Sequence, residues 1–99
     1  MDQANVTRAF KNAVKTGLGH FVEDGYFIVL EVTGQKLKIR LGSRGGYPPE
    51  YELKDLLDAL PLKSEAIIQD KFFDGGSFWL KAWMILVKPV EEITKCQIK

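Results

Sequence analysis

The feature that most constrains this chain is an apolar run of about ten residues, Phe78–Val87, which contains both tryptophans and one charged residue, Lys81. A run of this length suits a buried strand, whereas a membrane-spanning helix needs about 20 apolar residues. Asp74–Ser77, directly before the run, has the composition of a tight turn. We therefore expect a hairpin formed by Glu65–Phe73 and Phe78–Lys88, against which the rest of the chain packs.

Both sides of this last strand are predicted to be apolar, because successive side chains of a strand point to opposite faces of the sheet. One side carries Trp79, Lys81 and Trp83, and the other is lined by Phe78, Leu80, Ala82, Met84 and Leu86. Helices in a two-layer fold cover only one side, so the C-terminal tail, a second copy or another protein would cover the other. Tryptophan is enriched at interface hot spots. We predict an interface at Trp79, Lys81 and Trp83 and expect a homodimer; the alternative is that both tryptophans are ordinary core residues.

Two segments have the periodicity of amphipathic helices. The first covers about residues 4–16, with Asp2 or Asn5 as its N-cap and Gly17 or Gly19 at its end; its apolar positions are Val6, Ala9, Phe10, Ala13, Val14 and Leu18. The second is predicted at Glu50–Ala59 and is followed by Pro61; its apolar positions are Leu53, Leu56, Leu57 and Leu60.

A second hairpin is predicted between the helices, from Tyr26–Val32 and Lys36–Leu41 joined by a turn at Thr33–Gln35. The second of these strands alternates strictly, with Leu37, Ile39 and Leu41 on one face and Lys36, Lys38 and Arg40 on the other. This alternation is typical of a half-buried antiparallel strand. The glycines and prolines of Gly42–Pro49 predict an irregular loop.

The predicted order is helix, two strands, helix, two strands and a short closing element at Val90–Lys99. The 45% of hydrophobic residues is enough to build a core for one domain over residues 1–99. We therefore expect an α+β, two-layer sandwich in which two helices cover one face of an antiparallel sheet of about four strands.

The basic side chains of the central hairpin are a candidate binding surface for nucleic acid or another anion. Lys36, Lys38 and Arg40 would line one sheet face about 7 Å apart, roughly the phosphate repeat of a nucleic-acid strand. Arg44 in the glycine-rich loop could reach a phosphate, and Tyr47, with Tyr26 or Phe27, could stack on a base. The alternative is a solvated strand face whose lysines protect an edge from aggregation.

No catalytic or metal-binding motif is evident. His20 lies near Glu23 and Asp24, among residues that we expect to form a loop, yet no nucleophile and no diagnostic ligand spacing accompany it. The glycine-rich loop lacks the lysine and hydroxyl residue of a P-loop. Cys96 is the only cysteine, which excludes an intrachain disulfide and a cysteine-based zinc site, and its default role is packing. We expect no catalytic residues, no cofactor, no metal and no enzymatic activity.

Basic and acidic residues nearly balance, 14 against 13, which argues against a protein whose main role is to coat nucleic acid. The N-terminus has no signal-peptide pattern, so we expect a soluble cytoplasmic protein with no membrane partner. The size and plain composition are similar in style to small accessory proteins of viruses or mobile elements, without a shared motif. The sequence predicts a non-catalytic protein-interaction module that self-associates; the alternative is a weak nucleic-acid-binding module using Lys36, Lys38, Arg40 and Arg44.

Overall fold

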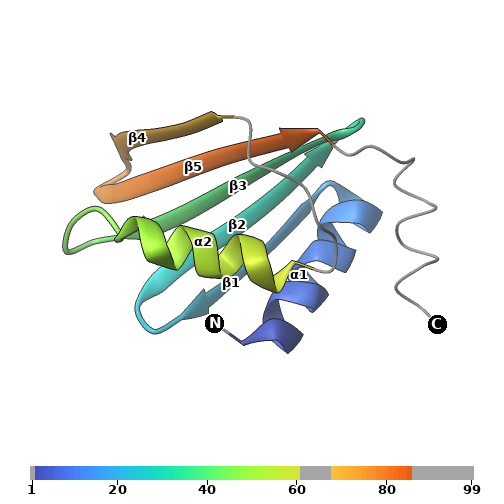
Figure 1. Ribbon diagram of the computed structural model, residues 1–99, viewed down its shortest axis with the longest axis horizontal. Coiled ribbons are helices and arrows are strands. Elements are labelled where there is room, and N and C mark those ends of the chain that lie inside the picture. Colours follow the sequence, from blue (N-terminus) through green and yellow to red (C-terminus); the bar gives the residue numbers. More distant parts are fainter. Residues whose placement is uncertain (1, 61–67, 86–99) are drawn as a thin grey trace.

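The computed structural model describes residues 2–60 and 68–85, and its arrangement is shown in Figure 1. Within these residues the elements are α1 (Gln3–Thr16), β1 (Leu18–Glu23), β2 (Tyr26–Thr33), β3 (Lys36–Ser43), α2 (Glu50–Ala59), β4 (Ile68–Asp74) and β5 (Ser77–Ile85). The predicted α+β class is confirmed. The expected sheet of about four strands is wrong, because the described part of the chain forms five.

The strands form one open antiparallel sheet in the order β1-β2-β3-β5-β4. The two predicted hairpins, β2–β3 and β4–β5, are both present, and they join because β3 pairs with β5 along its whole length. The chain therefore leaves the middle of the sheet after β3, passes through α2, and returns by way of the edge strand β4. β3 and β5 lie at the centre of the sheet.

Both helices lie against the same face of the sheet (Figure 1). The core between the layers contains the apolar stripes of α1 and α2 and the inward-facing residues of β2, β3 and β5: Val6, Ala9, Phe10, Ala13, Ile28, Leu30, Leu37, Ile39, Leu41, Leu53, Leu56, Leu60, Leu80, Ala82 and Met84. This cluster confirms that Leu37, Ile39 and Leu41 face inward while the basic residues between them face outward.

The ends of α1 follow the predicted capping chemistry. The Asp2 carboxylate accepts a hydrogen bond from the Ala4 N–H at 2.9 Å. Gly17 adopts φ 92°, in the left-handed region that glycine tolerates best, and its N–H donates to the Ala13 carbonyl at 2.8 Å. α2 has the predicted bounds, and its first turn carries Glu50 and Glu52 near the positive end of the helix dipole.

The strand missing from the sequence prediction is β1. The residues around His20 were expected to form a loop, yet Leu18–Glu23 pairs with β2 along its whole length. Gly19 does not end the helix; it faces α1 so closely that an added Cβ would overlap the Ala9 carbonyl. Glycine at this position lets the helix and the strand approach each other.

The expected irregular loop also begins later than predicted. Gly42 and Ser43 are the last residues of β3 and pair with Trp79 and Phe78 of β5. Other predictions lie outside the described residues: the start of the C-terminal hairpin before Ile68 and its end after Ile85, the stop at Pro61, the packing of Cys96 and the closing element at 90–99. None of the described helices has the length and apolar character needed to cross a membrane.

Candidate functional site

The candidate site is the sheet face turned away from both helices, which we call the open face. No described helix or strand lies over it. The register assigns to it alternate residues of every strand: Leu18, His20 and Val22 of β1, Phe27, Val29 and Glu31 of β2, Lys36, Lys38, Arg40 and Gly42 of β3, Trp79, Lys81, Trp83 and Ile85 of β5, and Asp70, Phe72 and Asp74 of β4.

The β3–β5 register brings the two predicted surfaces together. Lys38 pairs with Trp83, Arg40 with Lys81, and Gly42 with Trp79. A column of cations on β3 therefore runs beside a tryptophan–lysine–tryptophan column on β5. The interface residues and the basic stripe, which the sequence predicted as separate surfaces, form one site.

One end of the site is centred on Trp83, which is surrounded by ammonium groups. The Nζ atoms of Lys36, Lys38 and Lys81 lie 3.2, 5.1 and 5.2 Å from the centroid of its ring. The Glu31 carboxylate lies 3.9 Å from the Lys38 Nζ, and Asp70 of β4 stands opposite Lys81 in the register. The Trp83 Nε1 is covered and has no hydrogen-bond partner among the residues that the structure describes.

The other end of the site is an aromatic row centred on Trp79. Its indole lies over Gly42, where an added Cβ would come within 2.6 Å of the ring. Its ring centroid is 6.4 Å from that of Phe27 on β2 and 6.3 Å from that of Phe72 on β4, with interplanar angles of 40° and 13°. The Trp79 Nε1 donates to the Asp74 carbonyl at 3.2 Å, which orients the indole.

Two arginines border the aromatic row. The Arg40 Cζ lies 5.4 Å from the Trp79 ring centroid, and the Arg44 Cζ lies 5.6 Å from that of Phe27. The Arg40 Nε is covered and has no hydrogen-bond partner in the described part of the chain. Arg44, predicted from its place in the loop, therefore reaches the open face and adds to its positive charge.

Acidic side chains lie mainly at the margin of the open face. Asp70 and Asp74 belong to the edge strand β4, where Asp70 stands opposite Lys81 of β5, and Glu31 lies on β2 beside Lys38. The strands at the centre of the sheet, β3 and β5, contribute cations, tryptophans, Gly42 and, opposite Lys36, the exposed Ile85. The centre of the face is therefore positively charged.

Tyr47 does not join the site. Its ring packs edge-on against Phe78, with centroids 5.0 Å apart, and Phe78 belongs to the helix-covered side of β5. Tyr26, the other tyrosine considered for stacking, packs against the core beneath the helices. Of the aromatic residues proposed as additions to the basic stripe, only Phe27 lies on the open face.

His20 and Glu23 also lie apart. His20 is exposed on the open-face side of β1, opposite Val29, whereas Glu23 faces the helix side. The Glu23 carboxylate accepts a hydrogen bond from the backbone N–H of Asp2 at 3.1 Å. The structure thus gives this carboxylate a part in holding the start of α1 rather than in orienting His20.

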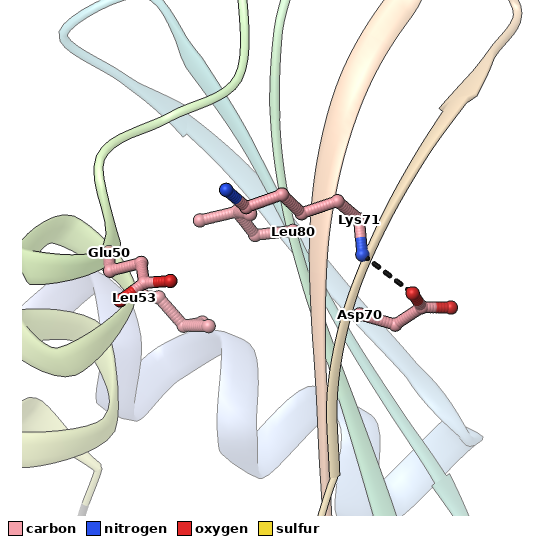
Figure 2. Close-up of a pocket in the computed structure, with 5 residues that line it drawn as sticks. All are labelled: Glu50, Leu53, Asp70, Lys71 and Leu80. Atoms are coloured by element: carbon pink, nitrogen blue, oxygen red, sulfur yellow. Dashed lines mark hydrogen bonds between the residues drawn. The ribbon is translucent and has the colours of Figure 1, made fainter.

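A separate cleft of about 330 Å³ opens on the helix side, between α2 and the β4–β5 hairpin. Figure 2 shows Glu50 and Leu53 on α2 facing Leu80, with the Lys71 side chain extending over Leu80 toward the helix. The Asp70 carboxylate, on the other side of β4, accepts a hydrogen bond from the Lys71 backbone N–H at 2.8 Å. Its five lining residues include no cysteine, histidine or hydroxyl side chain, so the open face is the stronger candidate site.

Phe72 and Glu31 are part of the site but were not predicted as such. The alternation of Asp70, Phe72 and Asp74 could have placed Phe72 on an outer face, but its neighbours depend on the strand order.

Comparisons with family models, curated proteins and solved structures find no match to the chain. The function is therefore inferred from the chemistry of the open face.

Proposed function

We propose that the protein binds single-stranded nucleic acid on the open face of its sheet. The observation that carries this proposal is the column of Lys36, Lys38 and Arg40 running beside Trp79 and Trp83. Proteins that bind single strands without strict sequence preference combine a cationic track for the phosphates with aromatic rings on which bases stack. The open face supplies both kinds of group within one register.

A single strand fits this surface better than a duplex does. The Trp79 indole lies over Gly42 on the sheet, so the ring offers a flat surface to an unpaired base. Bases inside a duplex are already stacked on their neighbours and cannot use such a ring without being unstacked. The basic residues of β3 are spaced about 7 Å apart, which suits contacts to successive phosphates of an extended strand.

Charge favours an anionic partner over a second copy of the same face. In a twofold-symmetric dimer the same surface patch is used by both subunits. Such a dimer of open faces would bring the lysines of β3 and β5 close to their own symmetry mates, and like charges facing each other disfavour association. The predicted apolar dimer through Trp79, Lys81 and Trp83 stays a prediction.

The proposal is tested by measuring the binding of a fluorescently labelled oligothymidylate by anisotropy at low salt. The double variant Lys38→Glu with Arg40→Glu replaces two cations of the β3 column by carboxylates. We expect it to weaken binding by at least about tenfold and to lower the log–log salt slope by about one per lost contact. A hairpin duplex of the same composition is expected to bind more weakly than the single strand.

The matched control is Arg8→Glu with Lys11→Glu, which makes the same charge change at two exposed positions of α1. This variant is expected to bind the oligonucleotide nearly as well as the unaltered protein. If the unaltered protein shows no binding at low salt, or if both double variants lose binding equally, the open face is not a nucleic-acid site.

A further inference from the structure

We infer that the open face is divided into a phosphate subsite around Trp83 and a base platform at Trp79. This inference rests on the proposed function and assigns different parts of the ligand to the two ends of the site. The phosphate subsite consists of Lys36, Lys38 and Lys81, whose ammonium groups surround one ring.

The three ammonium groups point to a polyanionic ligand. Each lies within 5.2 Å of the Trp83 ring centroid, and the acidic neighbours of the three are Glu31 beside Lys38 and Asp70 opposite Lys81, so the cations outnumber the carboxylates. A ring can attract cations, but it does not neutralise them, so three like charges around it repel one another. An anion between the ammonium groups removes this repulsion, and a phosphate oxygen accepts hydrogen bonds from lysine readily.

Trp83 is poorly placed to stack on a base. The Lys36 Nζ lies 3.2 Å above its ring and occupies the position that a stacked base would need. The ring holds the lysine in place by a cation–π contact. Trp83 therefore positions a phosphate-binding lysine.

Trp79 has the opposite surroundings. Among the described residues the cation nearest to its ring is the planar guanidinium of Arg40, whose Cζ lies 5.4 Å from the ring centroid, and Phe27 and Phe72 lie on either side of the ring. Guanidinium and aromatic groups both stack on nucleobases. This end of the face is a broad aromatic surface over Gly42, suited to one or two unpaired bases.

The separation of the subsites sets the minimum ligand. Trp79 and Trp83 are four residues apart on β5, which corresponds to about 13 Å along the strand. A mononucleotide is too short to place its base on Trp79 and its phosphate at the far lysines. The best short ligand is therefore an oligonucleotide of a few residues lying along β5.

The chain contains two tryptophans, so Trp79→Phe and Trp83→Phe each leave one indole as a fluorescent reporter. In the Trp79→Phe protein, inorganic tripolyphosphate is expected to change the emission of Trp83. In the Trp83→Phe protein it is expected to leave Trp79 unchanged, whereas oligothymidylate quenches Trp79. Lys36→Gln, added to the Trp79→Phe protein, is expected to weaken the tripolyphosphate response about tenfold, and Lys11→Gln in the same background is not.

The outcomes separate this inference from the proposed function. If oligothymidylate binds but tripolyphosphate affects both tryptophans equally, or if Lys36→Gln behaves as Lys11→Gln does, the division into subsites is wrong and nucleic-acid binding stands. If tripolyphosphate acts on Trp83 alone but no oligonucleotide binds, the proposed function fails and the phosphate subsite remains. Circular dichroism of each variant confirms that it is folded before titration.

Discussion

At the scale of single residues, the site depends on a glycine, because a side chain at that position would displace Trp79. Gly42 lies at the end of β3 directly beneath the Trp79 indole, and any Cβ there would meet the ring. Phe27 and Phe72 then flank the ring from the neighbouring strands. The position of Trp79 is thus determined by the small residue opposite it as much as by its own strand.

Gly42→Ala is expected to move the indole and to destabilise the fold by about 1–3 kcal/mol, the usual range for overpacking. The Cβ would come within 2.6 Å of the Trp79 ring. Urea unfolding measures the free energy of unfolding, and oligonucleotide anisotropy measures the effect on the platform. Gly45→Ala is the matched control, because a Cβ there meets nothing within 4 Å; a change within about 0.5 kcal/mol is expected for it. Equal behaviour of the two variants would contradict the role assigned to Gly42.

At the scale of elements, periodic segments were predictable and the glycine-interrupted strand was not. α1, α2 and β3 have strict helical or alternating patterns, and the structure confirms them. β1 has the sequence Leu-Gly-His-Phe-Val-Glu, and its glycine, Gly19, is one of the two glycines that the sequence offers as the end of the helix. Gly17 is the real stop, and Gly19 allows close packing that becomes visible only when the helix lies over the strand.

Gly19→Ala is expected to destabilise the protein by about 3 kcal/mol, at the upper end of the overpacking range. The new Cβ would overlap the backbone carbonyl of Ala9, which no side-chain rotation can move. Chemical unfolding measures the loss, and faster amide hydrogen exchange in α1 would locate it. His20→Ala, on the same strand but exposed on the other face, is expected to change stability by no more than about 0.5 kcal/mol. A Gly19→Ala protein as stable as His20→Ala would disprove the close-packing explanation.

The two edge strands show how the sheet limits further pairing. The Thr16 hydroxyl donates to the Leu18 carbonyl at 3.0 Å, and the Lys71 N–H donates to the Asp70 carboxylate at 2.8 Å. Each edge strand is joined to its neighbour by a two-residue turn. In the alternating hydrogen-bond pattern that follows, the backbone N–H and C=O groups of Leu18 and Lys71 point away from the neighbouring strand. Each edge thus has one of its outward backbone groups already bonded, which hinders edge-to-edge aggregation.

At the scale of the whole molecule, the near-zero net charge hides a separation of charge by face. The centre of the open face concentrates Lys36, Lys38, Arg40 and Lys81. On the other side of the sheet the charges are divided between the helices, because α2 carries Glu50, Glu52, Asp55 and Asp58 and α1 carries Arg8, Lys11 and Lys15. The sequence composition alone argued against a nucleic-acid-coating protein. Which charges gather on one face depends on the β3–β5 pairing, which joins segments far apart in the chain and follows from no local pattern.

The concentration of cations on the open face predicts how self-association of the protein depends on salt. We expect light scattering to show a monomer at low salt, because the lysines of two open faces repel each other. Any association through the tryptophans is expected to increase with salt, as screening weakens this repulsion. A dimer that persists unchanged at low salt and is lost in Trp79→Ala would instead support the apolar interface predicted from the sequence.

The pairing of β3 with β5 also makes the site a product of both halves of the chain. Arg40 and Lys81 are far apart in the sequence, with α2 and β4 between them. They become neighbours only when β5 pairs with β3 at the centre of the sheet. Contacts between such distant segments are slow to form because loop closure has an entropic cost. A chain cut in the loop after β3 would carry Lys36, Lys38 and Arg40 on one fragment and Lys81 with both tryptophans on the other. Ligand binding would then report that the two fragments had reassembled.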